Sequence, residues 1–357
     1  MKTVSNLDAR RWPDTLYRRA VLPERVLQFG TGMLLRALCA TSVDAANRAG
    51  RAAGRIVVVQ STAHGNARAL NAQDGLFTLV ERGLENGERV ERTRLIGAIS
   101  RALIAETEWQ TVRDVAARPE IRVIVSNVTE AGFQIEAQFP ARLTDALHAR
   151  FERLTDSPPL FVIPTELVPH NGARLAAMVD QLVPRFPRPA EFRRWLSTHV
   201  RFCSSLVDRI TTGEPAADDR AALEARLGYA DALLTVTEPY AFWAIEGDPE
   251  ALRHAFPIDA GESVIFERDI SFYETRKLRL LNATHTAIAP LALLAGIRTV
   301  RDALNDSRLG PFLRRILFDE IIPATDLPVD GARAFASSVV ERFSNPWLDH
   351  EWRMIAT

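Results

Sequence analysis

The chain has 357 residues, of which 47% are hydrophobic and 25% charged, with a formal net charge of −1. This composition is ordinary for a globular protein with room for two domains. The balanced charge excludes an electrostatic case for binding nucleic acid or an anionic membrane surface. The N-terminus carries charges where a signal peptide needs an apolar core, and Cys39 and Cys203 lack metal-ligand spacing. We expect a soluble, cytoplasmic protein with no membrane partner and no disulfide framework.

A strand, a glycine turn and a helix follow one another near the start of the chain. Apolar residues from Arg25 lead to Gly30 and Gly32, and helix-forming residues continue to Gly50. A second apolar strand over residues 55–60 completes a βαβ pattern. Such a turn lets backbone N–H groups at the helix start meet a pyrophosphate, so the segment predicts a dinucleotide site.

Two departures from the usual dinucleotide fingerprint leave a second interpretation open. Leu35 stands where a third glycine is usual, and the second strand ends in Gln60-Ser61-Thr62 without an acidic residue for the ribose hydroxyls. A tight structural turn at Gly30 and Gly32 would also fit the residues.

Two more apolar strands, over residues 121–126 and 160–164, predict a parallel sheet covered on both faces. Ligands gather at the carboxyl ends of such strands. The polar residues there are candidates to line a cleft, although they are also ordinary turn formers: Asn127, Thr129, Glu130 and Glu166.

Three prolines between Val183 and Pro189 predict a domain boundary, because proline cannot continue a helix. We expect a dinucleotide-binding domain over residues 1–188 and a mainly helical substrate domain over residues 189–357, giving an α/β protein. Helical patterns in the second part cover residues 190–199, 221–227, 273–294, 299–304, 310–321 and 331–343.

The predicted helix over residues 273–294 carries an unusual set of polar residues. At about 100° per residue, Asn282 lies about 140° and His285 about 80° from Lys277, and Glu274 lies about 60° away. A desolvated lysine can act as a base, while amide and imidazole N–H groups can hold an alkoxide or carbonyl oxygen. The alternative is a solvated ion pair beside a core histidine.

Six motifs in order give the chain a resemblance to the mannitol dehydrogenase family of polyol-specific long-chain dehydrogenases. Its closer similarity is to the branch of tagaturonate reductases, also called altronate oxidoreductases. The motifs are Gln28–Arg36, Gln73–Thr78, Val128–Phe133, Ser205–Ile210, Glu238–Glu246 and the set of Lys277, Asn282 and His285.

The resemblance implies a Rossmann-type N-terminal domain, a largely helical C-terminal domain and an active site between them. It also implies metal-independent, NAD-dependent interconversion of D-tagaturonate and D-altronate, hexuronates that would be the small-molecule partners. Lys277 matches the family's catalytic acid and base, Asn282 its oxyanion-stabilising amide, and His285 a substrate-orienting histidine. The preference for NAD over NADP rests on this likeness alone.

Further residues take expected roles from the same resemblance. Glu130 matches a glutamate implicated in proton passage to solvent, and Glu274 matches one near the catalytic lysine. Leu167 stands where relatives have a second oxyanion amide. Either Glu166, Asn171 or a main-chain N–H replaces that amide, or the site has one donor fewer. An arginine would suit a uronate carboxylate, although Asp208 and Arg209 could instead form a structural pair at a helix end. The expected cofactor contacts are Phe29, Gly30, Thr31, Gly32, Gln60, Asn127 and Thr129, and the expected substrate contacts are Asp208, Arg209, Arg342 and His350.

Three alternatives stay open. The chain could be a fructuronate reductase, a mannitol-type dehydrogenase, or a non-catalytic remnant that only binds nucleotide or a protein. Family members usually continue beyond the motif at residues 341–350, whereas this sequence stops at Thr357. If the following helices are absent, apolar surface should be exposed on the second domain.

Overall fold

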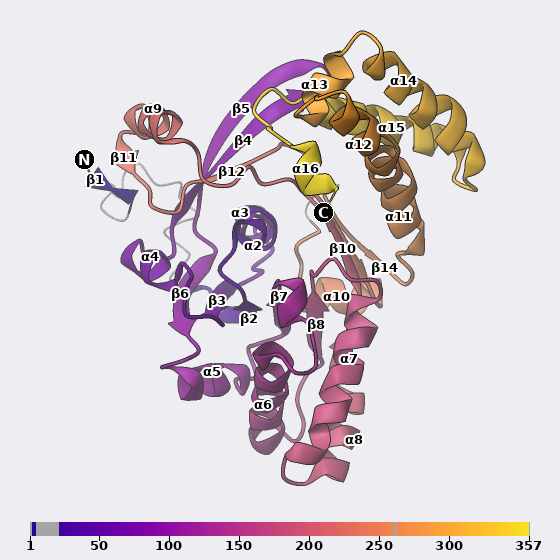
Figure 1. Ribbon diagram of the computed structural model, residues 1–357. Helices are drawn as coiled ribbons and strands as arrows, with labels where there is room; N and C mark the ends of the chain where they lie inside the picture. The colour runs from indigo at the N-terminus through magenta and orange to yellow at the C-terminus, as the bar shows by residue number, and fades with distance from the viewer. Residues whose placement is uncertain (1, 5–20, 260, 262, 357) are drawn as a thin grey trace. The chain divides into compact units, whose positions relative to one another are not determined.

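The computed structural model describes residues 2–4, 21–259, 261 and 263–356, which form two compact units (Figure 1). Unit 1 comprises Met1–Leu79, Arg94–Thr235 and Ala241–Arg268. Unit 2 comprises Val80–Thr93, Val236–Tyr240 and Asp269–Thr357.

A six-stranded parallel sheet forms the centre of unit 1, which confirms the predicted α/β class. Its strands are rich in valine and isoleucine, and consecutive residues point to opposite, buried faces. In sheet order the strands are β6 (Ile99–Ile104), β3 (Arg55–Gln60), β2 (Glu24–Phe29), β7 (Val123–Ser126), β8 (Leu160–Pro164) and β9 (Val200–Phe202).

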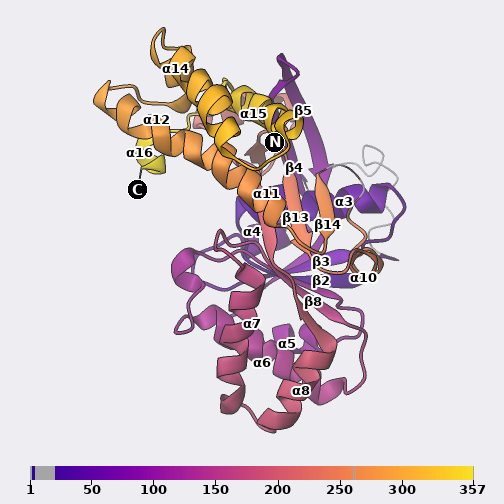
Figure 2. The ribbon, with the colours of Figure 1, turned by 90° about the vertical axis from the view of Figure 1, so that its right-hand side faces the viewer.

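Helices cover both faces of this sheet (Figures 1 and 2). Val26 and Val58 pack into one core with the helical run α2 (Met33–Leu35), η4 (Arg36–Ala40) and α3 (Thr41–Arg48), and with α4 (Ala67–Ala72). Leu27 and Val57 pack into the other core with α5 (Trp109–Ala116), α6 (Gln138–Arg153), α7 (Asn171–Leu182) and α8 (Pro189–His199). The division expected after residue 188 stays a prediction; α8 and β9, which follow that residue, belong to unit 1.

Unit 1 contains strands where the sequence predicted mainly helix. Strand β10 (Ser205–Asp208) pairs antiparallel with β13 (Phe242–Glu246), and β13 pairs parallel with β14 (Val264–Glu267). Each is only four or five residues long, too short to show a clear period of two. The other elements there are β1 (Lys2–Thr3), α9 (Ala217–Leu227), β11 (Tyr229–Ala230) and α10 (Pro249–Ala255), with 3₁₀ turns η5 (Glu130–Gly132) and η6 (Val183–Arg185). Strand β12 (Thr235–Thr237) begins in unit 1 and continues in unit 2.

Unit 2 is mainly helical, as predicted. Its longest helical run joins α11 (Ser271–Arg276), η7 (Lys277–Asn282) and α12 (Ala283–Leu294) and is seen along its length in Figure 2. No helix in the described ranges is both long and apolar enough to cross a membrane. The remaining helices are α13 (Val300–Asn305), α14 (Leu309–Arg315), η8 (Ile316–Ile321), η9 (Ile322–Ala324), α15 (Val329–Phe343) and α16 (Trp352–Ile355).

A β-hairpin contributes its outer part to unit 2. Strands β4 (Phe77–Glu85) and β5 (Glu88–Ile96) turn at Asn86 and Gly87, both with positive φ, as a two-residue hairpin turn requires. The hairpin was not predicted from the sequence. Large apolar side chains are exposed in unit 2 at Phe272, Leu278, Leu291, Leu293, Leu294, Val329 and Met354.

The glycine turn provides a matched test of backbone constraint. Gly30 has φ +119° and an added Cβ would lie 2.7 Å from the Asn127 carbonyl oxygen, whereas a Cβ at Gly32 would meet nothing within 4 Å. Gly30→Ala should therefore lower the free energy of unfolding by about 1–3 kcal/mol, and Gly32→Ala should change it far less. Urea unfolding measures both variants, and equal losses would contradict this explanation.

Candidate functional site

The glycine turn after β2 is held by side chains from three parts of unit 1. Arg36 donates from Nη1 to the Thr31 carbonyl at 2.7 Å and from Nε to Thr235 Oγ1 at 3.0 Å. Burial lowers the pKa of Arg36 to about 10, which still leaves it charged at neutral pH. Asn66 also hydrogen-bonds to Thr31 through its backbone N–H and side-chain amide. The turn is thus fixed before any ligand binds.

The residues of this turn fit a phosphate-binding role. Gly32 is exposed and precedes Met33, where a helical run to Arg48 begins. The first N–H groups of a helix have no partner within it and favour an anion. Phe29, by contrast, is fully buried and packs edge-on against Phe139 at 5.5 Å, beneath the turn.

Gln60 uses its amide to shape the loop after β3. Its Nε2 donates to the Thr62 carbonyl at 2.9 Å, and its Oε1 accepts from the Ala67 N–H at 3.0 Å. A Cβ on Gly65 would lie 2.8 Å from the amide carbon, so the loop closes tightly round it. Its expected contact with the cofactor stays a prediction.

At the carboxyl ends of β7 and β8, polar residues come together as predicted for a covered parallel sheet. Asn127 donates to Thr165 Oγ1 at 3.1 Å, and Thr129 Oγ1 accepts from the Gly132 N–H at 3.2 Å. Thr129 and Glu130 are exposed, whereas Glu166 is buried.

Glu166 is a buried carboxylate with two donors. It accepts from the Val128 N–H at 2.9 Å and from Ser126 Oγ at 3.1 Å. Burial raises its pKa, and these hydrogen bonds oppose the rise only in part.

The surroundings of Asn171 and Leu167 bear on the second oxyanion amide, whose usual position holds Leu167. Asn171 is 1% exposed, and its Nδ2 donates to the carbonyls of Glu166 and Ser205, both at 2.9 Å. Its Oδ1 accepts from the Ser205 N–H. Both of its amide hydrogens are used in joining β8 to β10. The Leu167 side chain is exposed and has no polar group to offer.

Asp208 and Arg209 lie at the end of a strand and not at a helix end, so that part of the alternative is wrong. Asp208 is the last residue of β10, and both side chains are buried. Arg209 donates from Nη1 to the Ala37 carbonyl in the π-helical turn η4. These residues belong to unit 1.

The helix with Lys277 differs from the uniform α-helix that the sequence suggested. Residues Lys277–Asn282 form a π-helical turn, in which the Ala283 N–H donates to the Leu278 carbonyl five residues back. Because a π turn holds more residues than an α turn, the five-residue spacing brings Lys277 and Asn282 closer to one face of the helix. The 140° separation calculated for an α-helix is therefore wrong for this pair. π turns inside α-helices occur often at functional sites.

His285 sits in an aromatic cluster of unit 2. Its ring stacks on Phe343 at 4.6 Å with an interplanar angle of 18°, and it meets His350 and Trp352 nearly perpendicularly, at 5.2 and 5.9 Å. His285 is buried, Lys277 and Glu274 are half-buried, and Asn282 is exposed. The imidazole is fixed by ring contacts on several sides.

Arg342 and His350, both predicted substrate contacts, lie beside this cluster. Arg342 forms a two-point ion pair with Glu238, at 2.9 and 2.8 Å, and its guanidinium lies 4.2 Å from the centre of the Tyr240 ring. Burial, and then the charge of Arg342, lower the pKa of His350, which favours its neutral form.

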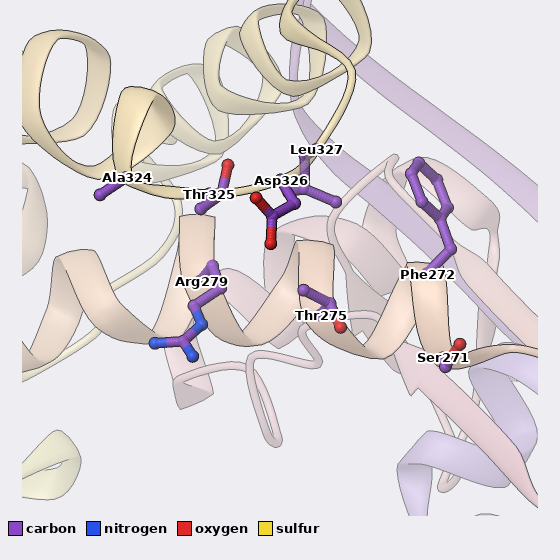
Figure 3. Close-up of a pocket in the computed structure, with 8 residues that line it drawn as sticks. All are labelled: Ser271, Phe272, Thr275, Arg279, Ala324, Thr325, Asp326 and Leu327. Atoms are coloured by element: carbon purple, nitrogen blue, oxygen red, sulfur yellow. The ribbon is translucent and has the colours of Figure 1, made fainter.

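A polar groove of about 430 Å³ lies elsewhere on the same helix (Figure 3). Thr275 and Arg279 line it, each two residues from Lys277, a spacing that places both on roughly the opposite side of the helix. The groove is therefore on the side of the helix away from Lys277. Its size does not make it the reaction site, because Lys277 does not face it.

Sequence reasoning missed the partners that hold these residues. Glu238 and Tyr240 were noted only as part of a motif, and Phe343 and Trp352 were not assigned a role. Among the residues that the structure describes, no group of three or more His, Cys, Asp or Glu could hold a metal ion. The expected independence from metals stays a prediction.

Comparisons with known proteins cover both units. Residues 24–255 match the mannitol dehydrogenase Rossmann domain, and residues 269–357 match the mannitol dehydrogenase C-terminal domain. The chain is 40% identical over 347 residues to the altronate oxidoreductase of Halalkalibacterium halodurans, covering 94% of this chain and 67% of that protein. It is 39% identical over 370 residues to the altronate oxidoreductase of Klebsiella pneumoniae, covering 100% and 74%.

Two solved structures are similar over nearly the whole chain. Pseudomonas fluorescens mannitol 2-dehydrogenase, solved as a ternary complex with NAD and D-mannitol, is 27% identical with a TM-score of 0.78, covering 96% of this chain and 73% of that one. A D-sorbitol dehydrogenase in substrate-free form is 24% identical with a TM-score of 0.83, covering 100% and 78%, and it supports the fold alone.

Glu166 predicts a pH dependence of stability with a definite sign. Burial raises its folded-state pKa above the ordinary 4.5, so the folded state binds more protons between those two values. The free energy of unfolding therefore falls as pH rises through that window, and the loss is complete above it. Glu166→Gln removes the titrating group.

The stability of the wild type minus that of Glu166→Gln should consequently fall from pH 4.5 upward and then level off. Urea unfolding of both proteins at a series of pH values measures this difference. A difference that rises with pH would contradict the burial argument.

Proposed function

The chain belongs to the mannitol dehydrogenase family, and from this premise we propose that it interconverts D-tagaturonate and D-altronate as an NAD-dependent oxidoreductase. The observation that carries the proposal is 40% identity to an altronate oxidoreductase over 347 residues, which span both units. The solved relative with NAD and D-mannitol supports the cofactor and the reaction at a CH–OH group.

Residues of unit 1 fit a dinucleotide. Gly30 and Gly32 add no side chain to the turn, and the helical run from Met33 presents its N–H groups there. Asn127 and Thr129 lie at the end of the neighbouring strand β7. When bound, NADH supplies a hydride to the keto carbon of the substrate.

In unit 2, Lys277 donates the proton that the oxygen needs as the ketone becomes an alcohol, and it takes the proton back in the reverse reaction. Asn282, brought closer to the Lys277 face by the π turn, donates its amide N–H to the same oxygen while negative charge develops there. His285, fixed by its aromatic neighbours, orients the substrate. Glu274 and Glu130 pass protons toward solvent.

Arg342 is the better supported partner for the substrate carboxylate. It belongs to unit 2 with Lys277, and it is linked to His285 through His350. A guanidinium matches a carboxylate through paired N–H donors. Arg209, which donates to the Ala37 carbonyl in unit 1, and the buried Asp208 stay candidates for substrate contacts.

The proposal predicts a clear order of substrates. With NADH in excess, kcat/KM for D-tagaturonate should exceed that for D-fructose, which lacks the carboxylate, by at least about tenfold, the value of one charge-assisted hydrogen bond. Absorbance of the reduced cofactor measures the rate, with D-fructuronate as a third substrate and NADPH as a second cofactor.

Each alternative would give a different result in the same assay. D-fructose reduced as well as D-tagaturonate would indicate a mannitol-type enzyme, and a preference for D-fructuronate would indicate a fructuronate reductase. Tight binding of NADH with no turnover of any keto sugar would indicate the non-catalytic remnant.

A further inference from the structure

Glu238 is a buried carboxylate outside the set of residues assigned a role above. It is 1% exposed and Arg342 is 7% exposed. The pair uses both Glu238 oxygens, with Arg342 Nε at 2.9 Å from Oε2 and Nη2 at 2.8 Å from Oε1. Tyr240, two residues along the chain, lies under the guanidinium with its ring centre 4.2 Å away. Two bonds and a ring face therefore fix both the plane and the position of the Arg342 head group.

Stability alone is a poor explanation for this arrangement. Removing two charges from water costs several kcal/mol per ion, and apolar residues of similar volume often stabilise a protein as well or better. A buried pair of this kind is therefore better explained by what the held charge does. Arg and Glu come from chain positions 104 residues apart, so local structure does not impose the contact.

Arg342 is next to the residues that surround the predicted reaction centre. Its positive charge reaches His350, whose ring meets the His285 ring at 90° with 5.2 Å between centres. Phe343, the residue after Arg342 in α15, stacks directly on His285. A shift of the Arg342 end of α15 would thus move the ring on which His285 rests.

We propose that Glu238 is a positioning residue, which holds the Arg342 guanidinium in place to bind the carboxylate of a sugar acid without touching that substrate itself. This inference rests on the function proposed above. On this proposal, selectivity for acid substrates depends on Glu238, a residue that does not contact the substrate. Glu238 acts on binding and leaves the hydride and proton steps to Lys277 and Asn282.

The test compares Glu238→Gln with a matched control, Glu341→Gln. Glu341 is adjacent to Arg342 in the sequence, but its carboxylate accepts from the Gly87 N–H at 2.6 Å. In Glu238→Gln we expect KM for D-tagaturonate to rise about tenfold or more, because a charge-assisted pair that orients Arg342 is lost. The kcat at saturation and the kinetics with D-fructose should change little, and Glu341→Gln should resemble the wild type.

A second variant separates positioning from a structural role and covers poor folding of Glu238→Gln. The exchanged pair Glu238→Arg with Arg342→Glu keeps a buried ion pair but moves the guanidinium. We expect it to recover thermal stability relative to Glu238→Gln and not to recover the low KM for D-tagaturonate. Recovery of both would show that the pair is only structural and would overturn the proposal.

Binding of D-altronate, measured by calorimetry, keeps the two proposals distinguishable. If the wild type turns over D-tagaturonate and Glu238→Gln has the same KM as the wild type, the positioning role alone would be overturned. Wild-type binding of D-altronate without turnover of D-tagaturonate would overturn the proposed function, and the affinities of the variants would still test Glu238. A wild type with neither binding nor turnover would overturn both.

Discussion

The buried ion pair between Glu238 and Arg342 is the interaction on which the organisation of unit 2 depends. Breaking such a pair leaves a buried charge without compensation, at a cost of about 3–5 kcal/mol, so the Glu238–Tyr240 segment and α15 must move together. The hairpin joins the same assembly, because Asn345 donates to the Arg82 carbonyl at 3.1 Å and a Cβ at Gly83 would lie 2.4 Å from Pro239. Three segments distant in the sequence are thereby fixed around one guanidinium.

The π turn from Lys277 to Asn282 packs against α15 in the core of unit 2. It widens the helix and so brings residues that are five apart closer to one face. His285, in the next turn, is held by Phe343 and Trp352 from the segments that follow α14. The reacting groups are carried by one helix, and the residues that fix their orientation come from elsewhere in unit 2.

The sequence predicts the regular elements well and the contacts between distant segments poorly. Strands Arg55–Gln60 and Leu160–Pro164 have the predicted bounds, because runs of valine and isoleucine bounded by polar residues are specific for buried parallel strands. The π turn was not predicted, since apolar spacing does not distinguish one inserted residue. The hairpin was missed because β5 is mostly polar and exposed and shows no alternation.

The candidate residues show the same limit. Polar residues at strand ends were found because topology gathers them, but Gln60 turns its amide into its own loop, which residue type does not reveal. The pairing of Arg342 with Glu238 spans 104 residues and leaves no local pattern. Residue types therefore identify which side chains could take part in the reaction. Packing decides which of those side chains instead hydrogen-bond to other parts of the protein.

The claim that Lys277 transfers the proton is tested most directly by chemical rescue. Lys277→Ala should lose about 10²- to 10⁴-fold in kcat with D-tagaturonate and NADH, the usual contribution of a general acid. Added methylamine should restore part of the rate in proportion to its concentration, and Arg279→Ala, on the other side of the same turn, should keep the wild-type rate. A Lys277→Ala variant with wild-type turnover, unaffected by the amine, would contradict the account.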